Sequence, residues 1–208
     1  MSINLNRGRG RRQDQQLTRR VVQAARANLA DGGFERLSLE GVARRAGVSR
    51  TAIYKRWPSF ADLLLDVAVD ALEDLGYPRN RLAMEQPDTG SLAGDLFTFF
   101  EDGLHRLVVL DRVGVARPLL AESILVPSLG ERVRAALFTG DEAIFGRILE
   151  TAVRRQEIAD PGADAEHVFQ TLIGYGIFRA YLVHLPLDGP GLQIICDTVS
   201  RGLARPSP

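Results

Sequence analysis

The apolar residues of this chain recur every three or four positions over long stretches, which is the spacing of amphipathic helices, and strand-like alternation is scarce. The pattern predicts an all-α protein with about nine helices, over residues 14–31, 39–46, 50–56, 59–76, 91–110, 112–123, 128–157, 164–184 and 192–203. Pro118 is expected to kink or split the sixth of these, because proline lacks the amide hydrogen that a helix interior needs. The polar stretch 77–90, which Pro78 and Pro87 interrupt, is expected to be a loop between two lobes.

Two short helices joined by a tight turn stand out in residues 38–57. Ser38 and Ser49 are suitable N-caps for these two helices, and Gly47 supplies the turn between them. The second helix ends at the tryptophan before Pro58, because a residue that precedes proline is pushed out of helical geometry. This layout is typical of a helix-turn-helix, in which the second helix enters the major groove of DNA.

Charge is distributed unevenly along the chain, although the formal net charge is zero. Residues 1–56 carry thirteen basic and four acidic side chains, and the rest of the chain offsets this surplus with a net charge of −9. Contacts to phosphate need cations. A basic N-terminal quarter on an acidic body therefore indicates a module that faces nucleic acid, attached to one with a different task.

Composition limits the class of protein further. The hydrophobic fraction of 45% and the charged fraction of 25% are ordinary for a soluble globular protein, and no apolar run is long enough to cross a membrane. The polar N-terminus has no apolar signal segment, so we expect a cytoplasmic protein. The single cysteine, Cys196, excludes an internal disulfide framework and a multi-cysteine zinc site, and its apolar neighbours predict a buried structural thiol. We expect neither a metal nor a cofactor.

The motifs within residues 12–66 resemble those of the TetR family of bacterial transcriptional regulators. The resemblance rests on GF at positions 33–34, on the S-L-x-x-V-A-x-x-A-G-V-S run that begins at Ser38, and on the I-Y-x-x-W-x-S run that ends at Ser59. Over the rest of the chain it is one of architecture only. It implies a homodimer that binds a palindromic double-stranded operator, usually as a repressor that a small molecule releases. The family usually has a lysine directly after the last serine. This chain has Phe60 there, so the phosphate contact of that lysine is absent.

The second helix of the helix-turn-helix supplies the candidate DNA contacts. We expect Arg50 to read a base, because a guanidinium can pair with both acceptors of a guanine edge, and Thr51 to meet a base or a thymine methyl group. The resemblance assigns Tyr54 to a phosphate, and Ser49 is expected to reach one through its hydroxyl and the helix N-terminus. The remaining candidates, whose cations have a simple solvated surface role as the alternative, are Ser38, Arg44, Arg45, Lys55 and Arg56.

The predicted organisation has four segments, namely a flexible basic arm (1–12), a helix-turn-helix domain (13–58), a connecting helix (59–76) and an effector-binding and dimerisation domain (77–208). The arm contains the run RGRGRR, which could enter the minor groove as other basic arms do, or could be a solvated tail. Phe34 and Leu37, in the loop after the first helix, are expected to fill the core.

The C-terminal half is rich in phenylalanine and tyrosine, which favours an apolar ligand pocket between helices. For each of these residues a plain core position is the alternative. His105 and Gln170 rank higher, because a polar group on an apolar face needs a partner, which a ligand or a backbone carbonyl could supply. The candidate effector residues are Phe100, Leu104, His105, Phe145, Gln170 and Tyr175. Nothing in the pattern specifies a class of ligand.

The helix expected over 164–184 is apolar on nearly every face, which indicates burial on more than one side. A second subunit is a natural cover for the side that its own lobe leaves open, and Gly174 and Gly176 would permit a close approach of helices. The helix over 192–203 could complete that contact. The candidate dimer residues are Val168, Leu172, Ile173, Gly176, Ile195 and Val199.

These features predict a DNA-binding transcriptional regulator, in the first instance a homodimeric repressor released by a small-molecule effector. A transcriptional activator and a sequence-tolerant architectural DNA-binding protein are the alternatives. An enzyme is not expected, because the three histidines are scattered and no HExxH, GxSxG or phosphate-loop glycine pattern occurs. A nucleophilic Cys196 is disfavoured, since its apolar neighbours would raise the pKa of the thiol.

Overall fold

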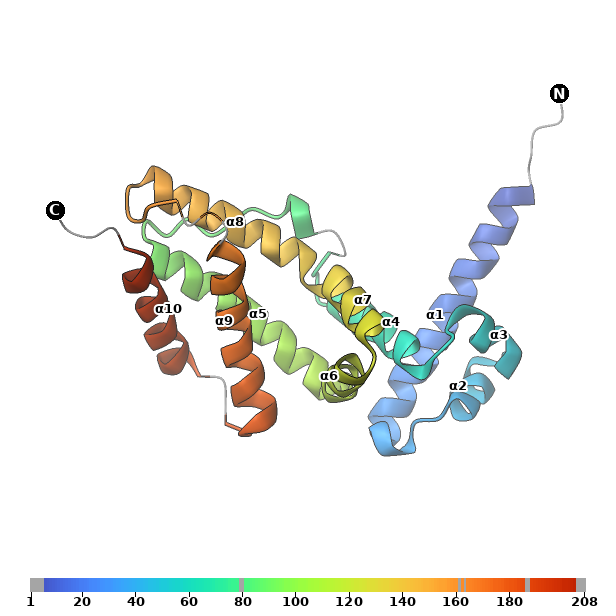
Figure 1. Cartoon of the computed structure of the whole chain (residues 1–208). Coiled ribbons are helices and arrows are strands. Elements are labelled where there is room, and N and C mark those ends of the chain that lie inside the picture. The colour runs from blue at the N-terminus through green and yellow to red at the C-terminus, as the bar shows by residue number, and fades with distance from the viewer. Residues whose placement is uncertain (1–5, 79–80, 161, 163, 186–187, 205–208) are drawn as a thin grey trace, which may run out of the picture. The chain divides into compact units, whose positions relative to one another are not determined.

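The computed structural model describes residues 6–78, 81–160, 162, 164–185 and 188–204 of the 208-residue chain (Figure 1). The described residues form ten α-helices and no β-strand, which confirms the predicted all-α class. The helices are α1 (Asn6–Gly32), α2 (Leu39–Ala46), α3 (Arg50–Arg56), α4 (Phe60–Glu73), α5 (Leu92–Val113), α6 (Ala116–Leu125), α7 (Pro127–Leu137), α8 (Thr139–Arg154), α9 (Asp164–Ile177) and α10 (Gly189–Leu203). Short 3-10 turns at Phe34–Arg36 and Arg81–Ala83 and a π-helical turn at Phe178–Leu182 accompany them.

The tenth helix arises because the single helix predicted over 128–157 is two helices in the structure. α7 ends at Leu137 and α8 begins at Thr139. Thr139 and Gly140 both have low helix propensity. Gly140 also lies so close to the preceding 3-10 turn that an ideal Cβ on it would be 2.6 Å from the Cβ of Arg81. The start of α8 therefore packs closely against a segment distant in the sequence, a contact that the local pattern does not encode.

Pro118 does not kink or split a helix as predicted. It lies in the first turn of α6, which begins at Ala116, and there a backbone N–H has no acceptor within the helix. The interruption comes earlier, at Gly114 between α5 and α6, where φ is 84° and a side chain would be strained. The proline therefore marks the start of a helix.

The described chain divides into two compact units. Unit 1 contains the residues up to Gly76 together with Val109–Val133, and unit 2 contains Tyr77–Val108 and the residues from Arg134 onward. The expected domain 77–208 is therefore interrupted, because the end of α5, all of α6 and the first part of α7 group with the N-terminal helices.

Unit 1 has an apolar core to which α1, α2, α3 and α4 each contribute one face. Its buried side chains include Val21, Ala25, Leu29, Val42, Ala43, Ile53, Leu63, Leu64 and Val67. The loop residues expected to fill this core lie less deep. Phe34 is 40% exposed and Leu37 is only half-buried, so the prediction that they plug the core is wrong for Phe34.

The ends of α1 and α4 differ from the predicted ones. α1 begins at Asn6, so residues 6–12 of the predicted flexible arm are helical, and residues 1–5 lie outside the described residues. Arginine and glutamine are good helix formers, and they carry the helix back toward the N-terminus. α4 ends at Glu73, and the chain then turns through Gly76, whose φ is 86°.

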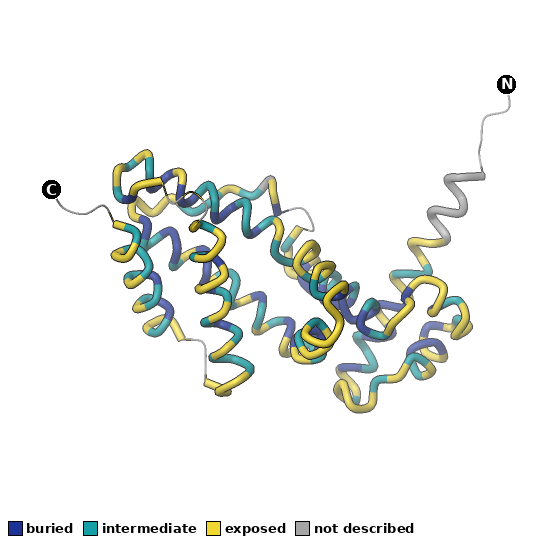
Figure 2. The backbone as a smooth tube through the Cα atoms, viewed as in Figure 1, coloured by how far each residue is buried: buried dark blue, intermediate teal, exposed yellow. Residues whose placement is uncertain are grey.

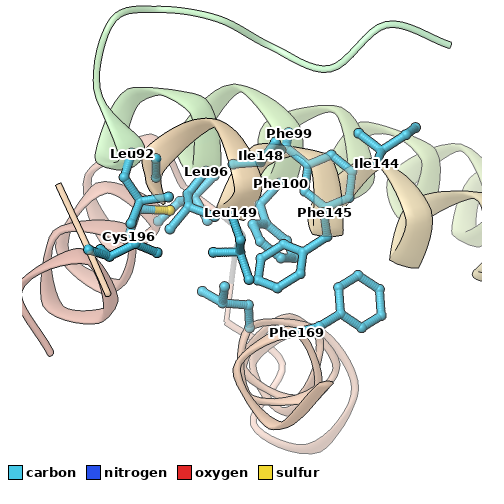
Figure 3. Close-up of a cluster of buried hydrophobic side chains, with 14 residues drawn as sticks. Leu92, Leu96, Phe99, Phe100, Ile144, Phe145, Ile148, Leu149, Phe169 and Cys196 are labelled. Carbon is cyan, nitrogen blue, oxygen red and sulfur yellow. The ribbon is translucent and has the colours of Figure 1, made fainter. Parts of the chain in front are cut away.

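Unit 2 is built around an aromatic cluster contributed by α5, α8 and α9 (Figure 3). The ring of Phe145 lies 6.2 Å from that of Phe100 and 5.4 Å from that of Phe169, between centroids. The same core includes Leu92, Leu96, Phe99, Ile144, Ile148, Leu149, Leu172, Leu192 and Cys196, so α10 is packed into it as well. Aromatic pairs at this separation add stability beyond the area that they bury.

The segment after α4, predicted to be a loop between lobes, is tied into unit 2 by a buried charge cluster. Arg81 Nε and Arg106 Nη2 lie 2.8 and 2.7 Å from the two carboxylate oxygens of Asp141. Both guanidinium groups lie over the ring of Tyr77, with their carbons 5.5 and 5.7 Å from its centroid. Burial, and then the charge of Asp102, raises the pKa of the Tyr77 hydroxyl above its ordinary value.

Figure 2 shows buried and exposed positions alternating along the helices, with mostly exposed positions at the corners between them. Several large apolar side chains remain exposed, namely Ile124, Leu125 and Val126 at the α6–α7 corner, and Phe178, Leu182, Val183, Leu185 and Ile194 from the end of α9 to α10. Within the described part of the chain, no helix is both long and apolar enough to span a membrane.

Candidate DNA interface and effector region

Each helix of the helix-turn-helix begins with a serine whose side chain makes a capping hydrogen bond. The hydroxyl oxygen of Ser38 accepts from the backbone N–H of Gly41, and that of Ser49 from the backbone N–H of Ala52, each at 3.1 Å. Gly47 ends α2 in the left-handed region, with φ of 66°. The two predicted DNA-contacting serines therefore cap the two helices, and each hydroxyl hydrogen is still available for an outside acceptor.

One face of α3 is held on the core and the rest of the helix points outward. Ile53 is fully buried, and Trp57, the C-cap residue, is 2% exposed. The exposed side chains of the helix are Arg50, Thr51, Tyr54, Lys55 and Arg56, which are all predicted DNA contacts. The core contacts thus set the orientation of α3, while its polar face is available to a partner.

Arg50 and Tyr54 lie one helical turn apart and contact each other. The guanidinium carbon of Arg50 is 6.0 Å from the centre of the Tyr54 ring. A hydrogen bond to Tyr54, and then the charge interaction with it, raises the pKa of Arg50 above its ordinary value. The base reader predicted from the sequence is therefore an exposed, charged donor near the start of α3.

Two of the predicted DNA cations have carboxylate partners inside unit 1. Arg45 Nη1 lies 2.5 Å from Asp31 Oδ2 and 2.9 Å from Asn28 Oδ1, both on α1. Arg56 Nη1 lies 2.5 Å from Asp14 Oδ1, also on α1. These contacts give both arginines a role in joining the helix-turn-helix to α1, and a phosphate would have to compete with them.

Arg44 and Lys55 have different surroundings. Both side chains are exposed, and within the described residues neither forms an ion pair. They are the cations of α2 and α3 that remain available to the DNA backbone. The side chains of the predicted arm, with its possible minor-groove contact, lie outside the described part of the structure.

Phe60, the residue that stands where the family resemblance leads us to expect lysine, stacks on Phe34. The two ring centroids are 6.0 Å apart and the ring planes are inclined by 30°. An apolar contact between the loop after α1 and the start of α4 therefore replaces a phosphate contact. The sequence contains both aromatic residues, but their spacing alone does not connect them.

The aromatic effector candidates are mostly part of the core. Phe100 and Phe145 are buried in the aromatic cluster of unit 2, and Leu104 is partly buried against it. Tyr175 is half-buried, and the guanidinium carbon of Arg179 lies 5.7 Å from the centre of its ring. The positions of these residues therefore agree with the alternative interpretation of the sequence, in which they are ordinary core residues.

The polar effector candidates lie on the surface of unit 2. His105 is exposed, and its Nδ1 lies 2.9 Å from the hydroxyl oxygen of Tyr77. Gln170 is exposed as well and donates a hydrogen bond to Glu166 at 2.9 Å. Each polar group has a partner within the protein. Because both side chains are exposed, the structure does not bring them together with the buried phenylalanines in one enclosed site.

An open hollow of about 460 Å³ lies along α8 and the beginning of α9 in unit 2. Leu149 and Val153 give it an apolar side, Glu150 and Arg154 contribute charges, and Gly146 leaves space for it. The volume is in the range of small-molecule sites. None of the predicted effector residues lines it, and no motif in the sequence points to it.

The six predicted dimer residues all lie toward the interior of unit 2. Leu172 and Gly176 are buried, and four more are partly buried against the core, namely Val168, Ile173, Ile195 and Val199. The residues that α9, its π-helical extension and α10 leave outward are others, including Gly174, Phe178 and Ile194. In the single chain α9 is buried along one face and exposed on the other, and the apolar pattern did not separate the inner face from the outer one.

The described side chains offer little to metal or nucleophilic chemistry. Among them, no three histidine, cysteine, aspartate or glutamate residues lie close enough together to hold a metal ion. Cys196 is buried, and desolvation by burial, followed by the charge of Asp197, raises the pKa of its thiol to about 12. The thiol is therefore protonated and shielded at neutral pH.

A capped helix-turn-helix with an exposed cationic recognition helix, joined to a second helical unit with its own core, defines a DNA-binding transcription regulator. Models of two domain families match the chain, one described as bacterial regulatory proteins of the tetR family over residues 21–67, the other as the tetracyclin repressor-like C-terminal domain over residues 86–199. The second match alone spans more than half of the chain. The protein belongs to the TetR family of transcriptional regulators, as the sequence resemblance predicted.

Similar proteins agree with this assignment. An uncharacterized HTH-type transcriptional regulator of Mycobacterium bovis is 29% identical over 171 residues, which are 82% of this chain and 79% of the relative. The HTH-type transcriptional regulator AqdR of Rhodococcus erythropolis is 26% identical over 173 residues, covering 82% of this chain and 76% of AqdR. A solved TetR-family regulator matches with a TM-score of 0.58 and 25% identity, over 91% of this chain and 100% of its own. The flavonoid-responsive regulator FrrA shares the fold, with a TM-score of 0.58 and 21% identity over 91% of this chain and 95% of FrrA.

Proposed function

We propose that this regulator is a homodimeric repressor that binds a palindromic operator through α3 and that a small molecule releases. The observation that carries the proposal is the face of α3, where Arg50, Thr51 and Tyr54 are exposed on a helix that Ile53 and Trp57 fix to the core. A recognition helix held in this way can enter the major groove with its first residues at the base edges. Arg50 is the base reader in this proposal.

The phosphate contacts in the proposal come from the rim of the same surface. Ser49 has a hydroxyl hydrogen to donate at the N-terminus of α3, where the helix dipole favours an anion. Arg44 and Lys55 add two cations without intramolecular ion pairs among the described residues. Arg45 and Arg56 contribute charge to the surface, but their main role is to hold α1 against the helix-turn-helix.

The proposed dimer forms through the outer faces of α9 and α10. Phe178, Leu182 and Ile194 expose more than half of their surface, and Gly174 meets nothing within 4 Å of an ideal Cβ, so a second helix could approach closely there. Burial of these side chains by a second copy would remove apolar surface from water. A two-fold dimer presents two copies of α3, which requires a palindromic operator.

The proposed effector is an apolar or aromatic small molecule that binds in unit 2. The hollow along α8 offers an apolar side, formed by Leu149 and Val153, with Glu150 and Arg154 nearby. The structurally similar regulator FrrA is named for its response to flavonoids, which are aromatic compounds. That name supports an aromatic ligand here without identifying it.

Selection of bound sites from a pool of random duplexes tests the proposal. We expect the protein to enrich an inverted repeat with half-site centres one helical turn apart, about 34 Å, or a multiple of it. The enriched duplex should then survive competition with excess random duplex. Enrichment of a single, non-repeated site would contradict the dimer, and no enrichment would favour the architectural DNA-binding alternative.

Transcription from a promoter that carries the selected site separates repressor from activator. We expect addition of the protein to lower transcript yield in a purified transcription reaction, because a bound dimer blocks access of the polymerase. Higher yield would assign the protein as an activator. Return to the basal yield with aromatic compounds would identify effectors.

A further inference from the structure

Four aspartates follow one another along α4 at every fourth position, namely Asp62, Asp66, Asp70 and Asp74. Residues four apart are neighbours on a helix surface, and like charges at this spacing destabilise a helix. Such a row is therefore unfavourable unless other elements neutralise it. In this structure, each of the four carboxylates has a partner, and the partners outside α4 lie on α1, at the C-cap of α3 and on α7.

Three of these aspartates hold the N-terminal helices. Asp66 Oδ2 accepts a hydrogen bond from the indole nitrogen of Trp57, the C-cap of α3, at 2.9 Å. Asp70 Oδ2 lies 2.8 Å from Arg26 Nη1 of α1, and Asp74 accepts from the same nitrogen. Partial burial lowers the pKa of Arg26, but its hydrogen bonds to Asp74 and Asp70 and their negative charges together raise it, so the net pKa lies above the ordinary value.

Asp62 has partners on two different elements. Its Oδ2 accepts from the backbone nitrogen of Ser59 at 2.9 Å and from the Ser59 hydroxyl at 2.8 Å, which completes the capping box at the start of α4. Its Oδ1 accepts from Arg132 Nη2 on α7. Ser59 follows the end of α3 by three residues, so a single carboxylate joins the α3–α4 connection to α7.

We propose that Asp62 and Arg132 are positioning residues for operator recognition. Through Asp62, α7 becomes part of the frame that holds the end of α3, so the ion pair sets the orientation of the recognition helix without touching DNA. The inference rests on the proposed operator binding and goes beyond it by assigning a role to an ion pair outside the helix-turn-helix. Arg132 is the better residue to change, because its loss leaves the capping box of Ser59 and Asp62 intact.

The test compares Arg132→Gln with Arg134→Gln, using the duplex that the wild-type protein selects and a random duplex of the same length. Arg134 is on the same helix and loses the same charge, but its partner is Glu142. Removal of a partly exposed ion pair should weaken binding of the selected duplex by about twofold to fivefold. We expect this loss for Arg132→Gln only, with unchanged binding of the random duplex and an unchanged dependence of affinity on salt.

The salt dependence distinguishes positioning from direct contact. If Arg132 touched a phosphate, its loss would reduce the slope of log K against log salt by about 0.9 and would weaken both duplexes alike. A second variant, Asp62→Asn, keeps an oxygen that can accept from Ser59 but removes the charge that Arg132 needs. The variant that combines Arg132→Gln with Asp62→Asn should bind the selected duplex no more weakly than Arg132→Gln alone, because the two changes remove the same interaction.

The outcomes separate this inference from the proposed function. If the wild-type protein selects no duplex, operator binding itself is wrong. If it selects one and Arg132→Gln behaves like Arg134→Gln, the positioning role is overturned while the proposed function stands. Additive losses in the double variant, or a lower salt slope for Arg132→Gln, would also overturn it. Equal melting temperatures of the two glutamine variants, followed by circular dichroism, confirm that the comparison concerns folded protein.

Discussion

Arg44 and Arg45 are neighbours on α2 with the same charge, yet the structure gives them different surroundings. Arg45 reaches α1, where Asp31 and Asn28 accept its hydrogen bonds, whereas Arg44 is exposed without an ion pair among the described residues. A helix-turn-helix motif marks both as candidate phosphate contacts. Only the packing of α1 beside α2 distinguishes a cation that holds the fold from one that is free to bind DNA.

Arg44→Ala and Arg45→Ala should therefore have different effects. We expect Arg44→Ala to reduce the slope of log K against log salt by about 0.9, for one lost phosphate contact, and to leave stability unchanged. Arg45→Ala should lower the free energy of unfolding by about 0.2–1 kcal/mol, the usual value of an exposed ion pair, with a smaller change in slope. Urea titrations and binding at several salt concentrations measure both quantities. A larger change in slope for Arg45→Ala than for Arg44→Ala would show that the Arg45–Asp31 ion pair breaks when the protein binds DNA.

Arg50→Ala tests the base reader. Loss of a bidentate guanine contact should weaken the selected operator roughly 5- to 150-fold and leave random duplex nearly unaffected. Lys55→Ala serves as the comparison, because a phosphate contact weakens all sequences about equally. Competition binding with both duplexes measures the ratio. Equal losses on both for Arg50→Ala would assign Arg50 to the DNA backbone instead.

Cys196 should be unreactive in the folded protein. Its thiol is buried and has a pKa of about 12, so the nucleophilic thiolate is scarce at pH 8. Iodoacetamide should label the native protein very slowly and the urea-unfolded protein rapidly, as mass spectrometry would record. Rapid labelling of the native state would show that the core of α10 opens readily.

The same raised pKa predicts a direction of pH dependence. Below the ordinary thiol pKa of about 8.5, Cys196 is protonated in both folded and unfolded states and contributes nothing to the pH dependence. Between about 8.5 and 12, the unfolded state loses the proton first, so the free energy of unfolding falls as pH rises. Cys196→Ala should unfold with a shallower pH dependence in this range. Curves of equal slope for the two proteins would contradict the shift.

At the scale of elements, the sequence pattern predicts the helices well and their limits less well. The caps at Ser38, Ser49 and Ser59 are local, so the starts of the helices that they begin could be predicted within one or two residues. Just after the break before α8, Gly140 lies close to the distant Arg81, and no local pattern contains this contact. The candidate DNA interface likewise combines features set by local sequence with features set by distant contacts.

The recognition helix is defined by local spacing and could be predicted residue by residue, because its inward and outward positions follow from helix geometry. Local spacing could not predict the ion pairs between α1 and α4 or the outward side of α9, since each depends on which elements pack together. Arg26 and Asp70, for example, are 44 positions apart and join α1 to α4. A spacing rule contains no information on such pairs.

Gly140→Ala tests the contact at the start of α8. An ideal Cβ would lie 2.6 Å from the Cβ of Arg81 and 3.2 Å from its Cα, so the 3-10 turn must move and disturb the ion pair of Arg81 with Asp141. We expect a loss of about 1–3 kcal/mol in the free energy of unfolding, as for other overpacked sites. Urea unfolding followed by circular dichroism measures it.

Gly146→Ala on the same helix is the matched control, because nothing lies within 4 Å of its ideal Cβ. Alanine is the better helix former, so this variant should be about 0.4–1 kcal/mol more stable than the wild type. If both alanine variants gained stability, the close approach of the turn to α8 would be wrong.

At the scale of the whole molecule, the cationic face lies on unit 1, which also exposes apolar side chains at the α6–α7 corner, and the apolar face proposed for the dimer lies on unit 2. Unit 1 presents the cations of α2 and α3 beside a row of aspartates that other elements of the unit neutralise. Unit 2 presents exposed apolar side chains at the end of α9 and on α10. A cationic face suits a phosphate backbone, and an apolar face suits a second copy of the chain. The proposed palindrome-binding dimer requires both.

The dimer proposal can be tested with two isoleucines that are about equally exposed. Ile194 on α10 is 63% exposed and Ile124 at the α6–α7 corner is 74% exposed. If the outer faces of α9 and α10 form the interface, Ile194→Glu places a charge in it without a partner, which strongly disfavours association. Ile124→Glu changes the same side chain in the same way on unit 1, outside the proposed interface.

Sedimentation velocity should show a monomer for Ile194→Glu and a dimer for the wild type and Ile124→Glu. Because a monomer binds only one half-site at a time, Ile194→Glu should also lose its preference for the inverted repeat over a single half-site. Dissociation by Ile124→Glu alone would move the interface to the α6–α7 corner, and dimers of both variants would exclude each of these surfaces.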